Sequence, residues 1–364
     1  MKKKILFLVL ISIIAFAGIV SAEDTLPNEQ GVYYLPDGLT DVRSVNFLNS
    51  QILLTSKSDQ GDVVMSVYQM GQSHLNGYHL FEATDVDKIT SGNLPNQQGI
   101  YYLPDGLTDV RGVDINNSEV IITSKADSGD VVMTIYQLGT SNLNSYAHFQ
   151  ATDINKIIDG SLGNEQGLYY IPDNLTDVRN LQIINSEIII TARSYSGDVF
   201  IIFYEFGNST PTSVAYFQPT PINDITSGNL PNEQGTYYLP DTFTDVRAVE
   251  ITSSEIALTS RTDAGDIVMT FYDHGNSAVA ALAHFKPINP DQLYTGSLSN
   301  EQGVYYLPDG LTDIRDVKIE NSEVILTSRS DSGEVFMVVY EFGKSEPTSF
   351  AYFQATDPEK CFKN

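Results

Sequence analysis

Short apolar runs separated by Gly, Asn, Asp and Ser recur along the whole chain and predict β-strands. A representative stretch contains five of them, at 101–104, 110–115, 119–125, 130–137 and 146–151. The turns "NNS" and "ADSG" between three of these runs are short, so those strands are expected to be antiparallel neighbours. Asp153–Ile157 predicts one helical turn, and no segment after the N-terminal run has the length and period of a long helix.

This pattern occurs five times with a period of 68 residues. The string "YYLPDGLTDVR" begins at Tyr33 and returns, with few changes, at Tyr101, Tyr169, Tyr237 and Tyr305. Fixed spacing without insertions is typical of repeat architectures. We divide the chain into a leader at 1–22 and one domain at 23–364, with repeats at 26–93, 94–161, 162–229, 230–297 and 298–364.

The middle strands of each repeat are apolar without interruption, as in Val120–Ile122, Val131–Met133 and Ile188–Ile190. A strand with apolar side chains on both sides must be covered on both faces. Five sheets stacked face to face in a closed ring satisfy this requirement, so we expect an all-β, five-bladed β-propeller. A tandem array of small β domains and an open β-solenoid are the alternatives.

The stretch "DVRSVNFLNSQILLTSKSDQGDVVMSVYQ", from Asp41, orders its strands and turns in a way that resembles the blades of WD40 propellers. The resemblance implies the blade arrangement alone. The chain has no Gly-His or Trp-Asp pair, contains no tryptophan, and has a longer repeat than that family.

The N-terminus is typical of a secretory signal peptide. Lys2, Lys3 and Lys4 precede the apolar run Ile5–Val20, and Val20-Ser21-Ala22 offers small residues for cleavage after Ala22. An uncleaved membrane anchor is the alternative, although the run is short for a span. Since no later segment could cross a membrane, we expect a secreted or cell-surface protein.

The charge of the chain is strongly negative. Without the three leader lysines, 17 basic residues face 46 acidic ones, which gives a net charge of −29. Such a chain repels nucleic acid. The expected partner is a carbohydrate or a surface protein. We also expect the protein to be a monomer. The single cysteine, Cys361, excludes an intramolecular disulfide and stands where other repeats have Ile or Leu.

Every repeat contains an Asp and an Arg two residues apart at the start of its first long strand. In extended chain both point to one side, which Val45 and Phe47 continue in the first repeat. We expect structural ion pairs; five arginines forming an axial anion site are the alternative, with each Arg neutralised by its own Asp. The pairs are Asp41–Arg43, Asp109–Arg111, Asp177–Arg179, Asp245–Arg247 and Asp313–Arg315.

Each repeat also begins with a Tyr-Tyr pair, and adjacent strand residues point to opposite faces. One tyrosine of each pair is therefore expected to be exposed, where five equivalent rings could stack on sugars with the benefit of avidity. The alternative is that both tyrosines pack between blades. The candidate binding tyrosines are Tyr34, Tyr102, Tyr170, Tyr238 and Tyr306.

The repeats differ from one another on the side of the inner strand that is not apolar, and one position there is polar in all five repeats. If this strand lies nearest the axis, these side chains line the channel and form a candidate binding site. They are Asn46, Asp114, Gln182, Glu250 and Lys318.

No cofactor is expected. The turn Asp59–Asp62 could contribute to calcium binding, but calcium needs six or more oxygens, and Tyr195 replaces the first acid in the third repeat. Neither a nucleophile elbow nor a P-loop is present, and the repeats have not diverged as a catalytic acid pair requires. We expect a non-enzymatic recognition or scaffold module, of which a lectin-like protein is one version. A cell-surface interaction protein is the alternative, and a glycoside hydrolase-like propeller is the third hypothesis.

Overall fold

The computed structural model describes residues 26–58, 61–91, 94–107, 109–116, 118–126, 130–175, 177–184, 186–243, 245–252, 254–262, 265–293, 298–311, 313–320, 322–330 and 332–361. The leader expected at 1–22 lies outside these residues.

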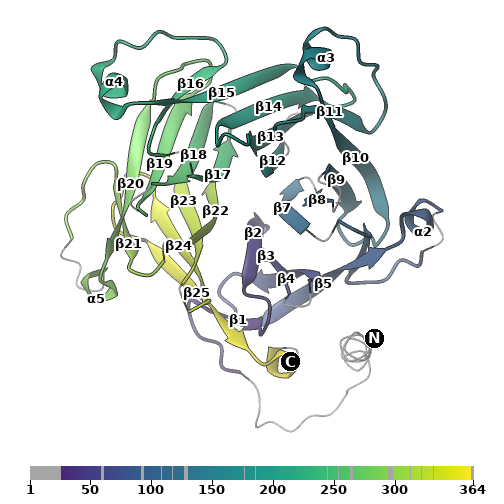
Figure 1. The fold of residues 1–364 in the computed structure, drawn as a ribbon. Helices are drawn as coiled ribbons and strands as arrows, with labels where there is room; N and C mark the ends of the chain where they lie inside the picture. Colours follow the sequence, from purple (N-terminus) through teal and green to yellow (C-terminus); the bar gives the residue numbers. More distant parts are fainter. Residues whose placement is uncertain are drawn as a thin grey trace.

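The chain folds into a five-bladed β-propeller, as the sequence predicts (Figure 1). Each blade is a five-stranded sheet. Blade 1 contains β2 (Asp41–Leu48), β3 (Gln51–Lys57), β4 (Val63–Gln69), β5 (Leu75–Thr84) and β6 (Ile100–Pro104). Blade 2 contains β7 (Asp109–Asn116), β8 (Glu119–Lys125), β9 (Val131–Gln137), β10 (Leu143–Thr152) and β11 (Leu168–Pro172). Blade 3 contains β12 (Asp177–Ile184), β13 (Glu187–Arg193), β14 (Val199–Glu205), β15 (Ser213–Thr220) and β16 (Thr236–Pro240).

Blade 4 contains β17 (Asp245–Ile251), β18 (Glu255–Arg261), β19 (Ile267–Asp273), β20 (Ala281–Ile288) and β21 (Val304–Pro308). Blade 5 contains β22 (Asp313–Glu320), β23 (Glu323–Arg329), β24 (Val335–Glu341), β25 (Ser349–Thr356) and β1 (Val32–Pro36). The inner strands β2, β7, β12, β17 and β22 contact one another in this cyclic order, and β22 returns to β2.

Blades and repeats are out of phase. Four antiparallel strands of each blade come from one repeat, whereas the outermost strand comes from the following repeat and pairs in parallel. Blade 5 takes its outer strand from the start of the domain, because β1 pairs with β25 over Val32↔Tyr352 to Pro36↔Thr356. The two ends of the domain therefore close the ring by backbone hydrogen bonds.

The hydrophobic core lies between blades, which explains the uninterrupted apolar strands. The cluster at the junction of blades 5 and 1 joins Val335 and Met337 of β24 to Val45 of β2 and Ile52 of β3. Four more clusters fill the other junctions in the same way. A single blade would leave the apolar side chains on the faces of its sheet uncovered, so each sheet depends on its neighbours in the ring for stability.

Three aromatic rings lock each junction. Between blades 1 and 2, Phe81 of β5 stacks on Tyr101 of β6 with ring centroids 5.0 Å apart. Tyr136 of β9 contacts Tyr101 edge-on, with ring centroids 5.4 Å apart. The Tyr136 hydroxyl donates a hydrogen bond of 2.8 Å to the carbonyl of Tyr102. Edge-to-face and stacked pairs each stabilise a core beyond their burial. The same triad recurs at the other four junctions.

The helices are short: four of them lie between the fourth strand and the outermost strand of a blade, and the last one follows β25. They are α2 (Val86–Thr90), α3 (Ile154–Ile158), α4 (Ile222–Ser227), α5 (Pro290–Leu293) and α6 (Pro358–Cys361). The helical turn predicted over Asp153–Ile157 is confirmed as α3, which begins after the N-cap Asp153. Among the described residues, no helix is long and apolar enough to span a bilayer.

Candidate functional site

A β-bulge at the start of every inner strand directs the arginine that recurs in all five repeats toward the axis. The register between β2 and β3 shifts between Val42 and Ser44, which leaves Arg43 unpaired, and the other four blades show the same shift. Val42 and Val45 consequently both enter the core, while Arg43 lines the channel. The expectation that Val45 and Phe47 continue the side of Arg43 is wrong, because a bulge inserts one residue into the alternation.

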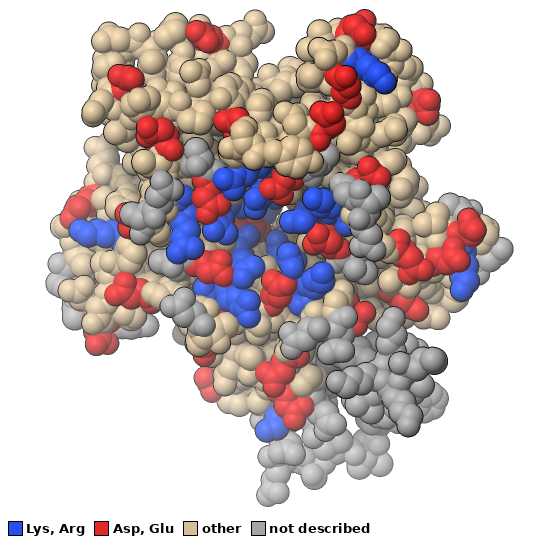
Figure 2. All heavy atoms as spheres, viewed as in Figure 1, with Lys and Arg blue, Asp and Glu red and all other residues tan. Residues whose placement is uncertain are grey.

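The five arginines surround one end of the channel, which we call the arginine mouth. They line a cavity of ≈140 Å³ together with Val42, Val178, Asp313 and Ile314. Figure 2 shows this end of the molecule, with blue side chains gathered around a central hollow and red ones between them. The arginines are Arg43, Arg111, Arg179, Arg247 and Arg315.

Each guanidinium forms an ion pair with the aspartate two residues before it. The Nη2–Oδ2 distances are 2.7–2.8 Å in all five blades. At the ring closure, Nη1 of Arg315 also lies 3.4 Å from Oδ1 of Asp41 in blade 1. The Asp–Arg pairs thus exist as the repeat pattern implies, and one of them extends across a blade junction. Exposed pairs of this kind contribute little stability on their own.

Lys57 and its counterparts form an outer basic ring that the sequence analysis missed. Lys57 ends β3 directly opposite Asp41 of β2 in the sheet register. Two members reach the next blade: Nη1 of Arg193 lies 4.0 Å from Oδ1 of Asp245, and Nη2 of Arg329 donates to Oγ1 of Thr40 at 3.3 Å. The signal in the sequence is a basic residue at this position in all five repeats. The outer basic ring consists of Lys57, Lys125, Arg193, Arg261 and Arg329.

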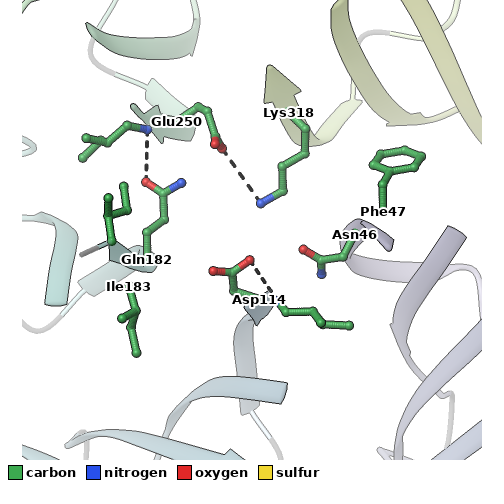
Figure 3. Close-up of a pocket in the computed structure, with 10 residues that line it drawn as sticks. Asn46, Phe47, Asp114, Gln182, Ile183, Glu250 and Lys318 are labelled. Atoms are coloured by element: carbon green, nitrogen blue, oxygen red, sulfur yellow. Dashed lines mark hydrogen bonds and ion pairs between the residues drawn. The ribbon is translucent and has the colours of Figure 1, made fainter. Parts of the chain in front are cut away.

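The other end of the channel, which we call the polar mouth, is a cavity of ≈160 Å³. Its polar lining is the set of variable inner-strand residues, Asn46, Asp114, Gln182, Glu250 and Lys318, with apolar neighbours that include Phe47 and Ile183 (Figure 3). The structure therefore brings the five variable positions together, one from each blade. At about 30 Å³ per water molecule, the cavity holds roughly five waters or one small polar group.

Two of these side chains bridge neighbouring blades. Nδ2 of Asn46 donates to the carbonyl of Val113 at 2.8 Å, and Oε1 of Gln182 accepts from the amide of Ile251 at 3.1 Å. Their exposed fractions are only 6% and 7%. These amides stabilise the ring and present their remaining polar atoms at the wall of the polar mouth.

The other three lining residues are charged. Nζ of Lys318 lies 3.9 Å from Oε2 of Glu250, and Oδ1 of Asp114 accepts from the amide of Ile115 at 2.9 Å. Asp316, two residues before Lys318, accepts the amide of Val45 across the ring closure at 2.9 Å. Burial raises the pKa of Asp316, and the charge of Asp114 adds to this rise, while Lys318 opposes it. Charges of both signs and amides thus converge on one small volume.

The expectation that one tyrosine of each pair is exposed is wrong. Tyr33 and Tyr34 are 6% and 3% exposed, and the other pairs are equally buried. The first ring of each pair packs in the aromatic triad. The second is covered by the segment before its own strand, as where Tyr102 donates to the carbonyl of Pro95 at 2.9 Å. Buried rings cannot stack on a sugar, which removes Tyr34, Tyr102, Tyr170, Tyr238 and Tyr306 as an accessible platform.

The calcium hypothesis concerns turns that are only partly described. Asp59, Asp127, Asp263 and Asp331 lie outside the described residues. Within the described part of the chain, no group of three or more His, Cys, Asp or Glu side chains is placed to hold a metal ion.

No protein-family model matches the chain. No curated protein matches its sequence. Solved structures that resemble it include the Dos1 propeller, with 12% identity over 87% of this chain and 60% of that chain and a TM-score of 0.31. Others are the WD40 domain of Toxoplasma gondii coronin (9%, 94% and 68%, TM-score 0.32) and the mitotic checkpoint complex (10%, 92% and 88%, TM-score 0.38). The chain spans less than two thirds of the first of these. Likenesses of this size add nothing to the fold that the strand registers establish.

Proposed function

We propose that this protein is a non-enzymatic recognition module that binds one small polar group, with a neutral sugar residue as the first candidate, in the polar mouth. The observation that carries the proposal is the convergence of Asn46, Asp114, Gln182, Glu250 and Lys318 on one cavity. Amides and carboxylates supply the donors and acceptors that sugar hydroxyls need. The five walls are unlike, so the site exists once per chain rather than five times.

The experiment is a glycan array of neutral saccharides followed by calorimetric titration of each hit. We expect one site per chain and no gain from presenting the ligand at fivefold valency. Asp114→Asn should weaken binding about tenfold or more, because a hydrogen bond to a charged acceptor contributes about 1.5–3 kcal/mol. Glu187→Gln, at the exposed start of β13, is the matched control and should change nothing. A silent array would rule out the sugar, and five equivalent sites would rule out the polar mouth.

The second candidate is a scaffold that binds a surface protein. It is favoured by the basic arginine mouth, which presents a charged surface on a chain that is otherwise acidic. Electrostatic complementarity of this kind selects partners and speeds their encounter. Capture of an acidic surface protein by the wild type, and not by a variant with Arg111→Gln and Arg179→Gln, would favour this candidate.

Export is part of the same proposal, supported by the basic and apolar leader Met1–Ala22. Sequencing the N-terminus of the protein recovered outside the producing cells should find Glu23 as the first residue. Retention of Met1 in a membrane fraction would instead favour an uncleaved anchor.

A further inference from the structure

The arginine mouth contains buried hydrogen-bond donors that the protein leaves unpaired. Each guanidinium has five N–H donors, and its aspartate accepts from Nη2. Nε of all five arginines is buried and has no acceptor among the described residues. Buried unpaired donors are rare in native proteins. The same Nε atom is unpaired in all five arginines of the mouth, so the feature belongs to the mouth as a whole.

The basic residues near the mouth outnumber the aspartates of the inner strands. Beside the five arginines stands the outer basic ring, so ten basic residues face the five aspartates of the inner strands. These ten are more than half of the 17 basic residues that follow the leader. Each Arg of the mouth is thus paired with its own Asp, and the outer basic ring adds five basic residues beside these pairs.

The nearby acidic turns between the second and third strands of each blade are partly engaged away from the axis. Asp130 contacts His148 of β10 at 3.6 Å, and Glu334 accepts from the hydroxyl of Tyr352 of β25 at 2.7 Å. Both partners lie on the fourth strand of their blade, far from the inner strand in the sheet order. The basic side chains lie closest to the axis, where Figure 2 shows the blue side chains gathered around the hollow with red ones between them.

We propose that the arginine mouth binds a tetrahedral oxyanion, a phosphate or sulfate group, on the axis of the ring. A planar guanidinium presents paired donors that match such oxygens, and an anion with several oxygens can contact several arginines at once. The cavity of ≈140 Å³ has room for one such group. The group arrives either as a free ion or at the end of a larger molecule, and this site is independent of the polar mouth.

The test is calorimetric titration of the full chain with inorganic phosphate and with sulfate, at ionic strength held constant with NaCl because surface charges are screened by salt. We expect both ions to bind. Arg111→Gln should weaken phosphate binding about threefold to tenfold, and the double variant R111Q/R179Q more than tenfold, as expected for losing charged hydrogen bonds at half-exposed side chains. The variant R111K/R179K keeps the positive charges and loses the planar guanidinium groups, so its phosphate affinity should fall between those of the wild type and R111Q/R179Q.

Two lysines provide matched controls. Lys344→Gln removes one positive charge in the turn between β24 and β25, which lines neither mouth, and Lys318→Gln removes one at the polar mouth. Neither variant should change phosphate affinity more than about twofold. If the arginine variants fail to fold, Lys125→Gln in the outer basic ring leaves the ion pairs intact and should weaken binding about threefold. Titration with glucose 6-phosphate beside glucose distinguishes a carried phosphate from a free one. Absence of binding at millimolar phosphate, or loss of binding in K318Q but not in R111Q/R179Q, would overturn the proposal.

Discussion

The hydroxyl of Tyr68 in blade 1 donates a hydrogen bond of 3.0 Å to the backbone carbonyl of Tyr34 in β1, which belongs to blade 5. The bond connects the first long hairpin of the domain to the strand that closes the ring. Tyr204 makes the equivalent bond to the carbonyl of Tyr170 between blades 2 and 3. The closing junction is therefore built from the same contacts as an internal one.

Tyr68→Phe should lower the free energy of unfolding by about 1–3 kcal/mol, because it leaves a buried carbonyl without its hydroxyl donor. Tyr204→Phe is the matched variant and should cost about as much, provided that the ring unfolds as one unit. Urea denaturation followed by circular dichroism measures both. If Tyr68→Phe costs nothing while Tyr204→Phe does, the ring is not closed by β1 in solution.

Gly99 should tolerate no side chain. It has φ +81°, and a Cβ there would lie 2.9 Å from the carbonyl oxygen of Tyr78. Gly99→Ala should therefore lower the free energy of unfolding by about 2–4 kcal/mol, which combines the cost of the left-handed conformation and a steric clash. Gly106→Ala is the control: its φ is +83° and nothing lies within 4 Å, so about 1 kcal/mol is expected. Equal losses in the two variants would show that the close approach is absent.

Asp316 should make the stability of the ring closure depend on pH. Because its pKa is raised in the folded protein, the folded chain holds a proton that the unfolded chain releases near pH 3.8. The free energy that Asp316 contributes therefore falls as the pH rises from about 3.8 through the raised folded pKa, and is constant above it. The free energy of unfolding of the wild type minus that of Asp316→Asn, measured by urea denaturation from pH 4 to 7, should fall as the pH rises over this window. A rise of this signed difference with pH would contradict the assignment.

Cys361 should be protected from alkylation while the ring is closed. It is 2% exposed on α6, its Sγ lies 3.9 Å from the carbonyl oxygen of Tyr34, and burial is the largest cause that raises its pKa to about 12. Because the thiolate is the reactive form, iodoacetamide at pH 8 should modify the native protein far more slowly than the urea-unfolded chain. Mass spectrometry measures both rates. Equal rates would show that α6 does not pack on β1.

The sequence was sufficient for the number of blades and for their stacking. Runs such as Ile188–Ile190 are buried throughout, and each core cluster joins two blades, as strands covered on both faces require. It was also sufficient to bring the five variable residues of the polar mouth together, because one polar position per inner strand must meet near the axis of any closed ring.

Three features could not be predicted from the pattern. The parallel pairing of Val32–Pro36 with β25 joins the two ends of the domain, and a run of five residues carries no signal for a partner that distant. The bulge at Arg43 adds one residue to the alternation without a glycine to mark it. The burial of Tyr34 depends on the segment that folds back over its strand, which the alternation of strand residues does not describe.

The assignment of different ligands to the two mouths can be tested in one measurement, methyl NMR of isoleucine-labelled protein. Ile115, Ile183 and Ile251 line the polar mouth, and Ile314 lines the arginine mouth. We predict that phosphate shifts the methyl signal of Ile314 and leaves the other three unchanged, whereas a neutral sugar found on the array does the reverse. Shifts confined to isoleucines on the outer surface of the blades, or no shifts with either ligand, would show that recognition does not occur on the axis of the ring.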